Sequence, residues 1–239
     1  MSEPEAAVVF LSWLRRGLST EITRVDKTGP PEARAELSVT LAFNEASLTP
    51  GVSVELLGPG EVTGLDRRAV IRTWPAAGVT DAEPNLFPIV EFDQADLPWR
   101  YTPARADAKD RLRPWLCLVV LSDDEIVAEE AAGRLLPLPT VTAAEAAVLP
   151  DLEQAWAWAH VQIGGVASDA DSSGVPEIVS AAPHRMTARL VAPRRLDAAT
   201  AYTALVVPTF ERGRLAGLGE TVPDDLDAES LRGRCRRSR

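Results

Sequence analysis

The chain has 239 residues, a formal net charge of -10, and a composition in which 46% of residues are hydrophobic. This is enough apolar material for a large core and excludes a wholly disordered chain. The acidic balance argues against nucleic acid as a partner, because a protein that neutralises phosphates needs a net basic face. The longest apolar runs, 116–121 and 204–208, fall far short of the roughly 20 residues of a membrane-spanning helix. We expect no membrane insertion.

The N-terminal segment and the cysteines predict a cytoplasmic protein. Residues 1–16, MSEPEAAVVFLSWLRR, place acidic residues before the apolar run and arginines after it, the reverse of a secretory signal. Cys117 lies in an apolar run and Cys235 in an arginine-rich tail. Two such cysteines make neither a disulfide framework nor a metal cluster, which is typical of a reducing compartment.

The first third of the sequence predicts short strands separated by turn residues. Residues 35–43, AELSVTLAF, alternate apolar and polar side chains with the period of a half-buried strand. Further strands are predicted at 52–57 and 69–74. The segment 8–18 fits either a strand that ends near Trp13 or one face of a helix, and its β-branched start favours the strand.

A proline-rich aromatic ribbon follows at residues 82–103, AEPNLFPIVEFDQADLPWRYTP. Because each proline removes a backbone donor, we expect the ribbon at a sheet edge or as an extended strap that lays aromatic groups over the sheet. The alternative is a surface that docks on another subunit with Trp99 and Tyr101 as anchors, since aromatic residues are enriched in interface cores. The candidate interface residues are Phe87, Phe92, Trp99 and Tyr101.

The remaining elements predict a mixed second half. The unbroken apolar run at 115–121 is typical of a buried strand at the centre of a sheet. Thr142 and Glu145 form a capping-box pattern, so we expect short helices at 142–148 and 151–159. A loop is predicted at 164–177. The last predicted elements are a strand ending at Val191, a strand at 202–207 and a glycine-terminated helix at 210–218.

These elements together predict a mainly β, α+β fold: an antiparallel or mixed sheet, or a sandwich, with a few short helices in the C-terminal half. Residues 1–125 form a β-rich core that includes the ribbon. Residues 126–219 form an α+β part that packs on the same core. Residues 220–239 are an acidic and then arginine-rich tail that we expect to be disordered.

The sequence offers few candidates for a metal or cofactor site. Asp169, Asp171 and Ser173 precede a glycine as in the opening of a calcium-binding loop, but the position that needs a bidentate glutamate is Ser180. This leaves a weak calcium candidate. His160 and His184 have no cysteine or second histidine at zinc-ligand spacing. We expect no cofactor.

The sequence also contains no complete catalytic constellation. It has no Gly-x-Ser-x-Gly motif, and Cys117 is more typical of a buried thiol than of a nucleophile. Carboxylates that could act in acid and base catalysis are grouped in two acidic stretches. These residues are Asp93 and Asp96 in the first stretch, and Asp123, Asp124 and Glu125 in the second. A carboxylate-based hydrolase or carbohydrate-active domain is therefore the alternative to a non-enzymatic protein.

Three long segments of the sequence carry a resemblance to a known family. They are residues 55–104, which begin ELLGPGEVTG, then RLRPWLCLVVL, and LVAPRRLDAATAYTALVVPTFERGRLAGLG. Together they resemble an uncharacterised family associated with contractile, phage-tail-like injection systems of actinobacteria and related bacteria. The resemblance covers most of residues 8–219. Members of the family continue further after GRLAGLG, so the resemblance also implies a shortened member.

The resemblance implies a structural or accessory subunit of the baseplate or of the particle's end, and it implies no catalytic residues. Such a subunit would be made in the cytoplasm and assembled into a particle that can be released. Its expected partners are other protein subunits of a large assembly, with a homo-oligomer as a further option. The expected function is assembly by protein–protein docking.

Overall fold

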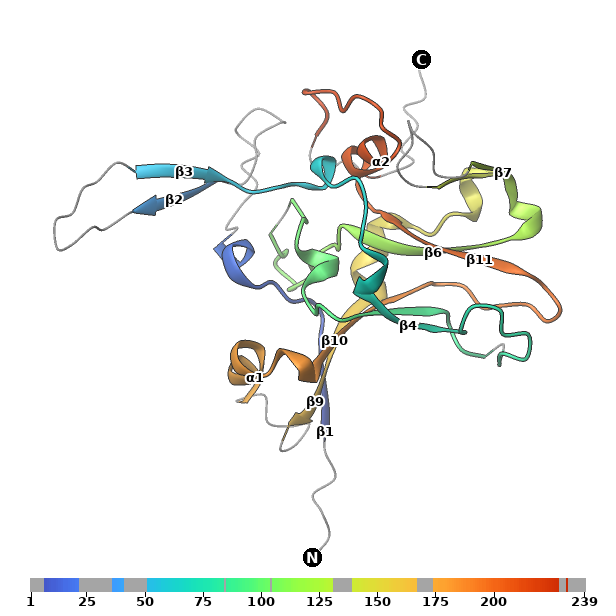
Figure 1. Ribbon diagram of the computed structural model, residues 1–239, viewed down its shortest axis with the longest axis horizontal. Coiled ribbons are helices and arrows are strands. Elements are labelled where there is room, and N and C mark those ends of the chain that lie inside the picture. Colours follow the sequence, from blue (N-terminus) through green and yellow to red (C-terminus); the bar gives the residue numbers. More distant parts are fainter. Residues whose placement is uncertain are drawn as a thin grey trace, which may run out of the picture.

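The computed structural model describes residues 7–21, 36–40, 51–83, 85–103, 105–130, 139–166, 174–227 and 231. Within these residues the protein is β-rich, with antiparallel strands and short helices (Figure 1). The prediction of a mainly β, α+β fold is confirmed. None of the described helices is long and apolar enough to cross a membrane.

The largest sheet contains five antiparallel strands in the order β1-β9-β10-β5-β4. Its strands are β1 (Ala7–Leu11), β4 (Val70–Trp74), β5 (Ile89–Phe92), β9 (Ala159–Val166) and β10 (Met186–Val191). The alternation expected of a half-buried strand is clear in β10, where Met186, Ala188 and Leu190 are buried and the residues between them are partly exposed. Because β9 and β10 lie between β1 and β5, the two halves of the sequence share one sheet.

Strand β6 (Leu116–Ser122) is the buried strand predicted at 115–121, and all 7 of its residues are buried. Among the described strands it pairs with β11 (Tyr202–Pro208) alone. The expectation that it lies at the centre of a sheet was therefore wrong. Its burial comes from β10 and from the 3-10 helices η4 (Leu97–Trp99) and η7 (Leu152–Trp158), which pack against it. Elements packed on the faces of β6 bury its side chains, although only one edge of the strand has a described neighbour.

The proline-rich ribbon enters the sheet instead of covering its edge. Its strand β5 lies between β10 and β4, so the predicted edge position was wrong. The strand fits there because its residues lie between Pro88 and Pro98 and include no proline, which leaves every backbone donor available. The chain then turns through η4, whose residues are all buried. The ribbon therefore builds the core.

Two further strands form a hairpin that stands apart from the rest of the structure. Strand β2 (Glu36–Thr40) pairs antiparallel with β3 (Gly51–Glu55), with Val39 opposite Val52. In Figure 1 the pair reaches away from the body of the molecule, and neither strand makes an extensive contact with another described element. We call β2 and β3 the arm. A second two-stranded hairpin joins β7 (Ile126–Glu130) to β8 (Thr140–Ala143).

The described helices are short, and most are of the 3-10 type. Apart from η4 and η7, the described helices are η1 (Gly17–Glu21), η2 (Pro59–Glu61), η3 (Arg67–Ala69), η5 (Asp123–Glu125), η6 (Ala146–Val148), η9 (Pro183–Arg185), α1 (Val175–Ala181) and α2 (Glu211–Gly217). A helix was predicted at 151–159, and η7 occupies this segment. It begins after Asp151, whose side chain accepts a hydrogen bond from the Glu153 backbone N–H at 3.0 Å. The helix predicted at 210–218 is α2, and Gly219 follows it with a φ of 69°.

The prediction of a helix at 142–148 was wrong. Thr142 lies in β8, opposite Ala128 of β7, and only Ala146–Val148 forms a single 3-10 turn. The β-branched residues of this strand favour an extended backbone, and pairing with β7 satisfies their backbone groups. The predicted loop at 164–177 was too long, because β9 continues to Val166 and α1 begins at Val175.

Helix α2 holds the root of the arm. The chain leaves β3 and enters η2, which packs on α2. Gly213 lies at the contact between η2 and α2. A Cβ added there would lie 2.7 Å from the Pro208 Cβ and 3.3 Å from the Pro59 carbonyl oxygen. Only glycine leaves room for this close approach. The arm therefore projects from an anchored base.

Candidate functional site

Two of the four predicted interface residues belong to the core of the protein. Phe92 and Trp99 are fully buried, and the Trp99 indole N–H donates to the Leu112 carbonyl oxygen at 3.2 Å. A side chain without exposed surface has nothing to offer a second subunit. The role of docking anchor predicted for Trp99, and the interface role predicted for Phe92, are therefore contradicted.

The other two candidates remain partly accessible. Tyr101 is half-buried and meets Trp115 edge to face, with ring centres 5.0 Å apart. Phe87 is exposed and meets Trp158 edge to face at 5.7 Å. Phe87 lies in the connection between β4 and β5, close in sequence to the exposed Leu86. Of the four candidates, Phe87 offers the most apolar surface for docking.

A row of polar side chains crosses one face of the five-stranded sheet. The strand register places His160 of β9 opposite Arg189 of β10, Arg189 opposite Glu91 of β5, and Glu91 opposite Arg72 of β4. One Glu91 oxygen lies 2.5 Å from Arg189 Nη2, and the other lies 3.4 Å from Arg72 Nε. One carboxylate is thus shared by two guanidinium groups. We call these four residues the polar row.

Burial determines the charge of the polar row. Glu91 is only 4% exposed, and a buried carboxylate is strongly unfavourable unless it is paired and hydrogen-bonded. Desolvation lowers the pKa of His160 below its ordinary value of 6.5, and the positive charge of Arg189 lowers it further, while Glu91 opposes the change. At neutral pH the histidine is therefore uncharged. The row combines two positive charges with one negative charge, and both guanidinium groups lie beside the one carboxylate.

The sequence prediction missed the polar row. Glu91 in IVEF and Arg189 in TARLV each stand as a single charge among apolar or small residues, which is the available signal. The two residues are 98 positions apart, so their pairing follows only from the strand order.

The outer edge of β4 is a second notable surface. No described strand pairs with this side of β4. Ile71 is 54% exposed and Trp74 is 41% exposed. Basic residues accompany these apolar ones, since Arg67, Arg68 and Arg72 lie within residues 66–74. Asp66 pairs with Arg68, and Glu91 of the neighbouring strand pairs with Arg72. We call residues 66–74 the β4 edge.

The arm is the third surface, and it has the opposite charge. Val52 is 41% exposed, and Leu57, just beyond the arm, is 57% exposed. The sequence from residue 36 to residue 55 contains Glu36, Glu45 and Glu55 and no lysine or arginine. Among the described residues, the two strands of the arm contact mainly each other, and a two-stranded hairpin by itself is marginal in water.

The acidic residues proposed for hydrolysis do not form one site. Asp96 is buried and pairs with Arg100 at 2.8 Å, while Asp93 is exposed. The Trp115 N–H at the start of β6 donates to the Pro98 carbonyl oxygen at 2.8 Å. Asp123 follows the other end of β6. At a rise of about 3.3 Å per residue, it lies about 25 Å from Trp115. Glycosidase carboxylates lie about 5 to 9.5 Å apart, so Asp96, two residues before Pro98, lies too far from Asp123 to act with it.

The second acidic stretch is engaged in local structure. Asp123 and Asp124 are exposed in η5, and Glu125 pairs with Arg194 at 2.5 Å. That pairing is the main cause that lowers the pKa of Glu125. The geometry gives the hydrolase alternative no support.

No metal site emerges from the part of the chain that the structure describes. This part contains no group of three or more histidine, cysteine, aspartate or glutamate side chains placed to hold an ion. His160 lies on β9 and His184 in η9, on separate elements. The calcium candidate of Asp169, Asp171 and Ser173 lies outside the described residues, as does Cys235.

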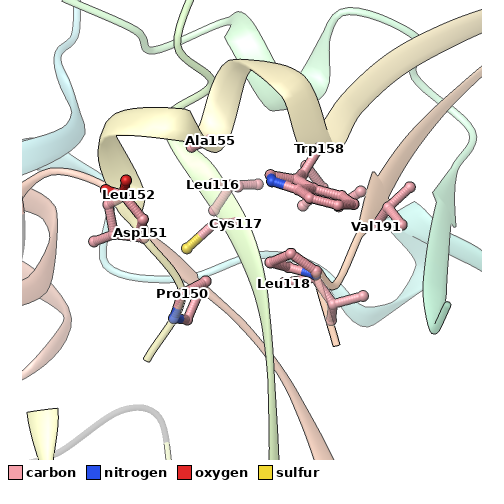
Figure 2. A pocket seen from close by; sticks show the side chains of 11 residues that line it. Leu116, Cys117, Leu118, Pro150, Asp151, Leu152, Ala155, Trp158 and Val191 are labelled. Atoms are coloured by element: carbon pink, nitrogen blue, oxygen red, sulfur yellow. The ribbon is translucent and has the colours of Figure 1, made fainter. Parts of the chain in front are cut away.

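A small apolar pocket lies where η7 crosses β6 (Figure 2). Trp158 and Ala155 of η7 face Leu116, Cys117 and Leu118 of β6 across it. The space between the side chains would hold roughly one water molecule. The pocket therefore does not suit a substrate, and Cys117 lies buried beside it as a packing residue.

Comparison with known proteins identifies no relative: no family model, no curated protein and no solved structure matches this chain. The resemblance of the three sequence segments to the injection-system family stays a prediction. The arm, the β4 edge and the polar row are therefore interpreted from their own geometry.

Proposed function

We propose that this protein is a non-enzymatic assembly subunit that docks on other proteins, as a structural or accessory component of a contractile, phage-tail-like injection particle. The observation that carries the docking function is the arm, a hairpin that projects from an anchored root and that no other described element covers. The outer edges of such a hairpin can form hydrogen bonds and apolar contacts when they add to a partner's sheet.

The assignment to an injection particle is supported by the resemblance of three long sequence segments. A subunit of this kind would assemble in the cytoplasm into a particle that can be released. The exposed Phe87 and Trp74 offer further contact surface beside the sheet. Exposed aromatic side chains of this type are common anchors in protein interfaces.

The test is incorporation into the particle in the native host. The full chain is compared with a variant in which a short Gly-Ser linker replaces residues 36–55, and particles are collected by sedimentation and probed for the chain. We expect the full chain in the particle fraction and the variant in the supernatant. Because the arm makes no extensive contact with other described elements, the variant should keep its denaturant midpoint. A full chain that stays in the supernatant would contradict the proposal.

A further inference from the structure

We propose that the β4 edge pairs with the β4 edge of a second copy of this chain, so that two copies form a dimer with two-fold symmetry. The contact takes the form of antiparallel strand addition, in which the five-stranded sheets of the two copies continue into each other. It uses a surface other than the arm, so it goes beyond the proposed docking function and does not depend on it.

Strand β4 is an open edge with few of the features that keep edge strands apart. Among the described elements it makes an extensive contact with β5 alone, and no described strand pairs with its outer side. Native edge strands are protected by prolines, by charged side chains or by a covering element. Strand β4 contains no proline, and its one charged residue, Arg72, already lies 3.4 Å from a Glu91 oxygen. Its other residues are β-branched or aromatic, which favours the extended backbone that a further strand needs.

Exposed apolar side chains are concentrated on β4 and on the connection that follows it. Of the ten large hydrophobic side chains that are exposed in the described part of the chain, five lie within residues 71–87. Two of these belong to β4 itself, where Ile71 is 54% exposed and Trp74 is 41% exposed. Under two-fold symmetry each side chain contributes twice, so strand pairing would remove the apolar area of four such side chains from water.

The two ends of β4 carry opposite charges. Residues 66–69, which lead into the strand, contain two arginines and one aspartate, a formal charge of +1. Residues 75–88, which follow the strand, contain one aspartate, one glutamate and no lysine or arginine, a formal charge of -2. One arginine pairs with the aspartate beside it. The side chains of Arg67, Asp81 and Glu83 are exposed and form no ion pair with another described residue, so they are free to meet a partner.

This charge polarity identifies a second copy as the partner. When two β4 strands run antiparallel, the start of each strand lies beside the end of the other, which brings Arg67 of each copy to the acidic connection of its partner. A parallel contact would place like charges together at both ends. Charge complementarity therefore favours the antiparallel arrangement that a two-fold axis requires, and such a contact closes at two copies. The other edge strand of the sheet, β1, contains no charged residue, so charge gives it no preferred partner.

The first test compares lysine substitutions at two exposed apolar positions. Molar mass is measured by size-exclusion chromatography with light scattering over a concentration series, and we expect the wild-type mass to rise from one chain to two. Ile71→Lys places a charge on the β4 edge and should raise the dimer Kd roughly tenfold or more. Val127→Lys, at a 67% exposed position of β7, is the matched control and should leave the Kd unchanged. Unfolding midpoints at low concentration check that both variants fold.

The second test exchanges the charges at the two ends of β4. One variant is Arg67→Glu, and the other combines Asp81→Lys with Glu83→Lys. Each variant alone should dimerise more weakly than the wild type, because like charges then meet at both ends of the contact. An equimolar mixture of the two should form mixed dimers with nearly the wild-type Kd, because both ends of the mixed contact pair opposite charges. Native mass spectrometry identifies the mixed dimer by its mass.

The outcomes separate the β4 dimer from the proposed function. A wild-type chain that stays monomeric, or whose mass continues to rise beyond two chains, would overturn the two-fold contact. A dimer that is insensitive to the substitutions at Ile71 and Arg67 would use another surface and would equally overturn it. A chain that dimerises as described but stays out of the particle fraction would contradict only the proposed function, whereas a monomer that enters the particle would contradict only the dimer.

Discussion

The ribbon at 82–103 and the arm are both apolar, strand-forming segments, yet they differ in burial. The ribbon contributes β5 and η4, whose Phe92 and Trp99 are completely buried. The arm exposes Val52 and makes no extensive contact with another described element. Their apolar content does not distinguish them. The difference is that β5 has a neighbouring strand on each side, whereas no described strand pairs with the arm outside its own two strands.

This contrast shows how to separate core from docking surface in a β-rich protein. An apolar strand with neighbours on both sides becomes part of the core, and its aromatic residues stabilise the folded state. An apolar strand without neighbours contributes little to stability and is available to a partner. The two regions should therefore respond differently to mutation.

The largest expected effect is on the free energy of unfolding when the ribbon is truncated. Trp99→Ala should destabilise the protein by about 3 to 5 kcal/mol, because it leaves a cavity and orphans the Leu112 carbonyl. Val52→Ser in the arm should cost less than about 1 kcal/mol, since it changes an exposed strand position. Denaturant unfolding of both variants checks the comparison. Equal midpoints would mean that the arm is part of the core.

A second contrast concerns ion pairs. Arg189→Ala should destabilise the protein by about 2 to 4 kcal/mol, because it removes the closest partner of the buried Glu91 carboxylate. The matched substitution Arg68→Ala removes the solvent-exposed pair with Asp66 and should leave the unfolding midpoint nearly unchanged. The measurement compares the unfolding midpoints of three proteins: the two single variants and a double variant that combines Arg189→Ala with Glu91→Gln. The double variant should be more stable than the sum of the two single effects predicts, since it leaves no buried charge unpaired.

Glycine substitutions test the root of the arm. Gly213→Ala should destabilise the protein by about 1 to 3 kcal/mol, because the new methyl group meets the Pro208 ring and the Pro59 carbonyl. Gly217→Ala, in the same helix, has open space around the added methyl group and should stabilise the protein by about 0.5 to 1 kcal/mol. Thermal unfolding distinguishes the two signs. A neutral Gly213→Ala would show that α2 does not clamp η2.

The smallest expected effect is a pH dependence of stability from His160. Its folded pKa lies below 6.5, so the unfolded chain takes up a proton first as the pH falls. The stability contribution is fully present above pH 6.5 and is lost as the pH falls through the folded pKa. His160→Asn should flatten the difference between urea midpoints at about pH 7.5 and about pH 5.5, whereas His184→Asn, at an exposed site, serves as the control. An unchanged difference in His160→Asn would exclude this residue as the cause.

The candidate site was less accessible to sequence reasoning than the strands that carry it. Phe87 was identified because aromatic residues are enriched in interfaces, and the same rule selected Phe92 and Trp99, which are buried. The rule depends on residue type and cannot determine whether a side chain faces solvent. The polar row escaped notice because its members lie on four strands that are far apart in the chain.

The sequence by itself determined most of the local elements. Alternation located β2, an unbroken apolar run located β6, and a terminal glycine located the end of α2. Only the tertiary structure decided the strand order, the insertion of the proline-rich ribbon between β10 and β4, and the isolation of the arm. The physical reason is that periodicity and capping depend on residues a few positions apart. Strand pairing and burial depend on distant segments, such as those that bring Glu91 to Arg189.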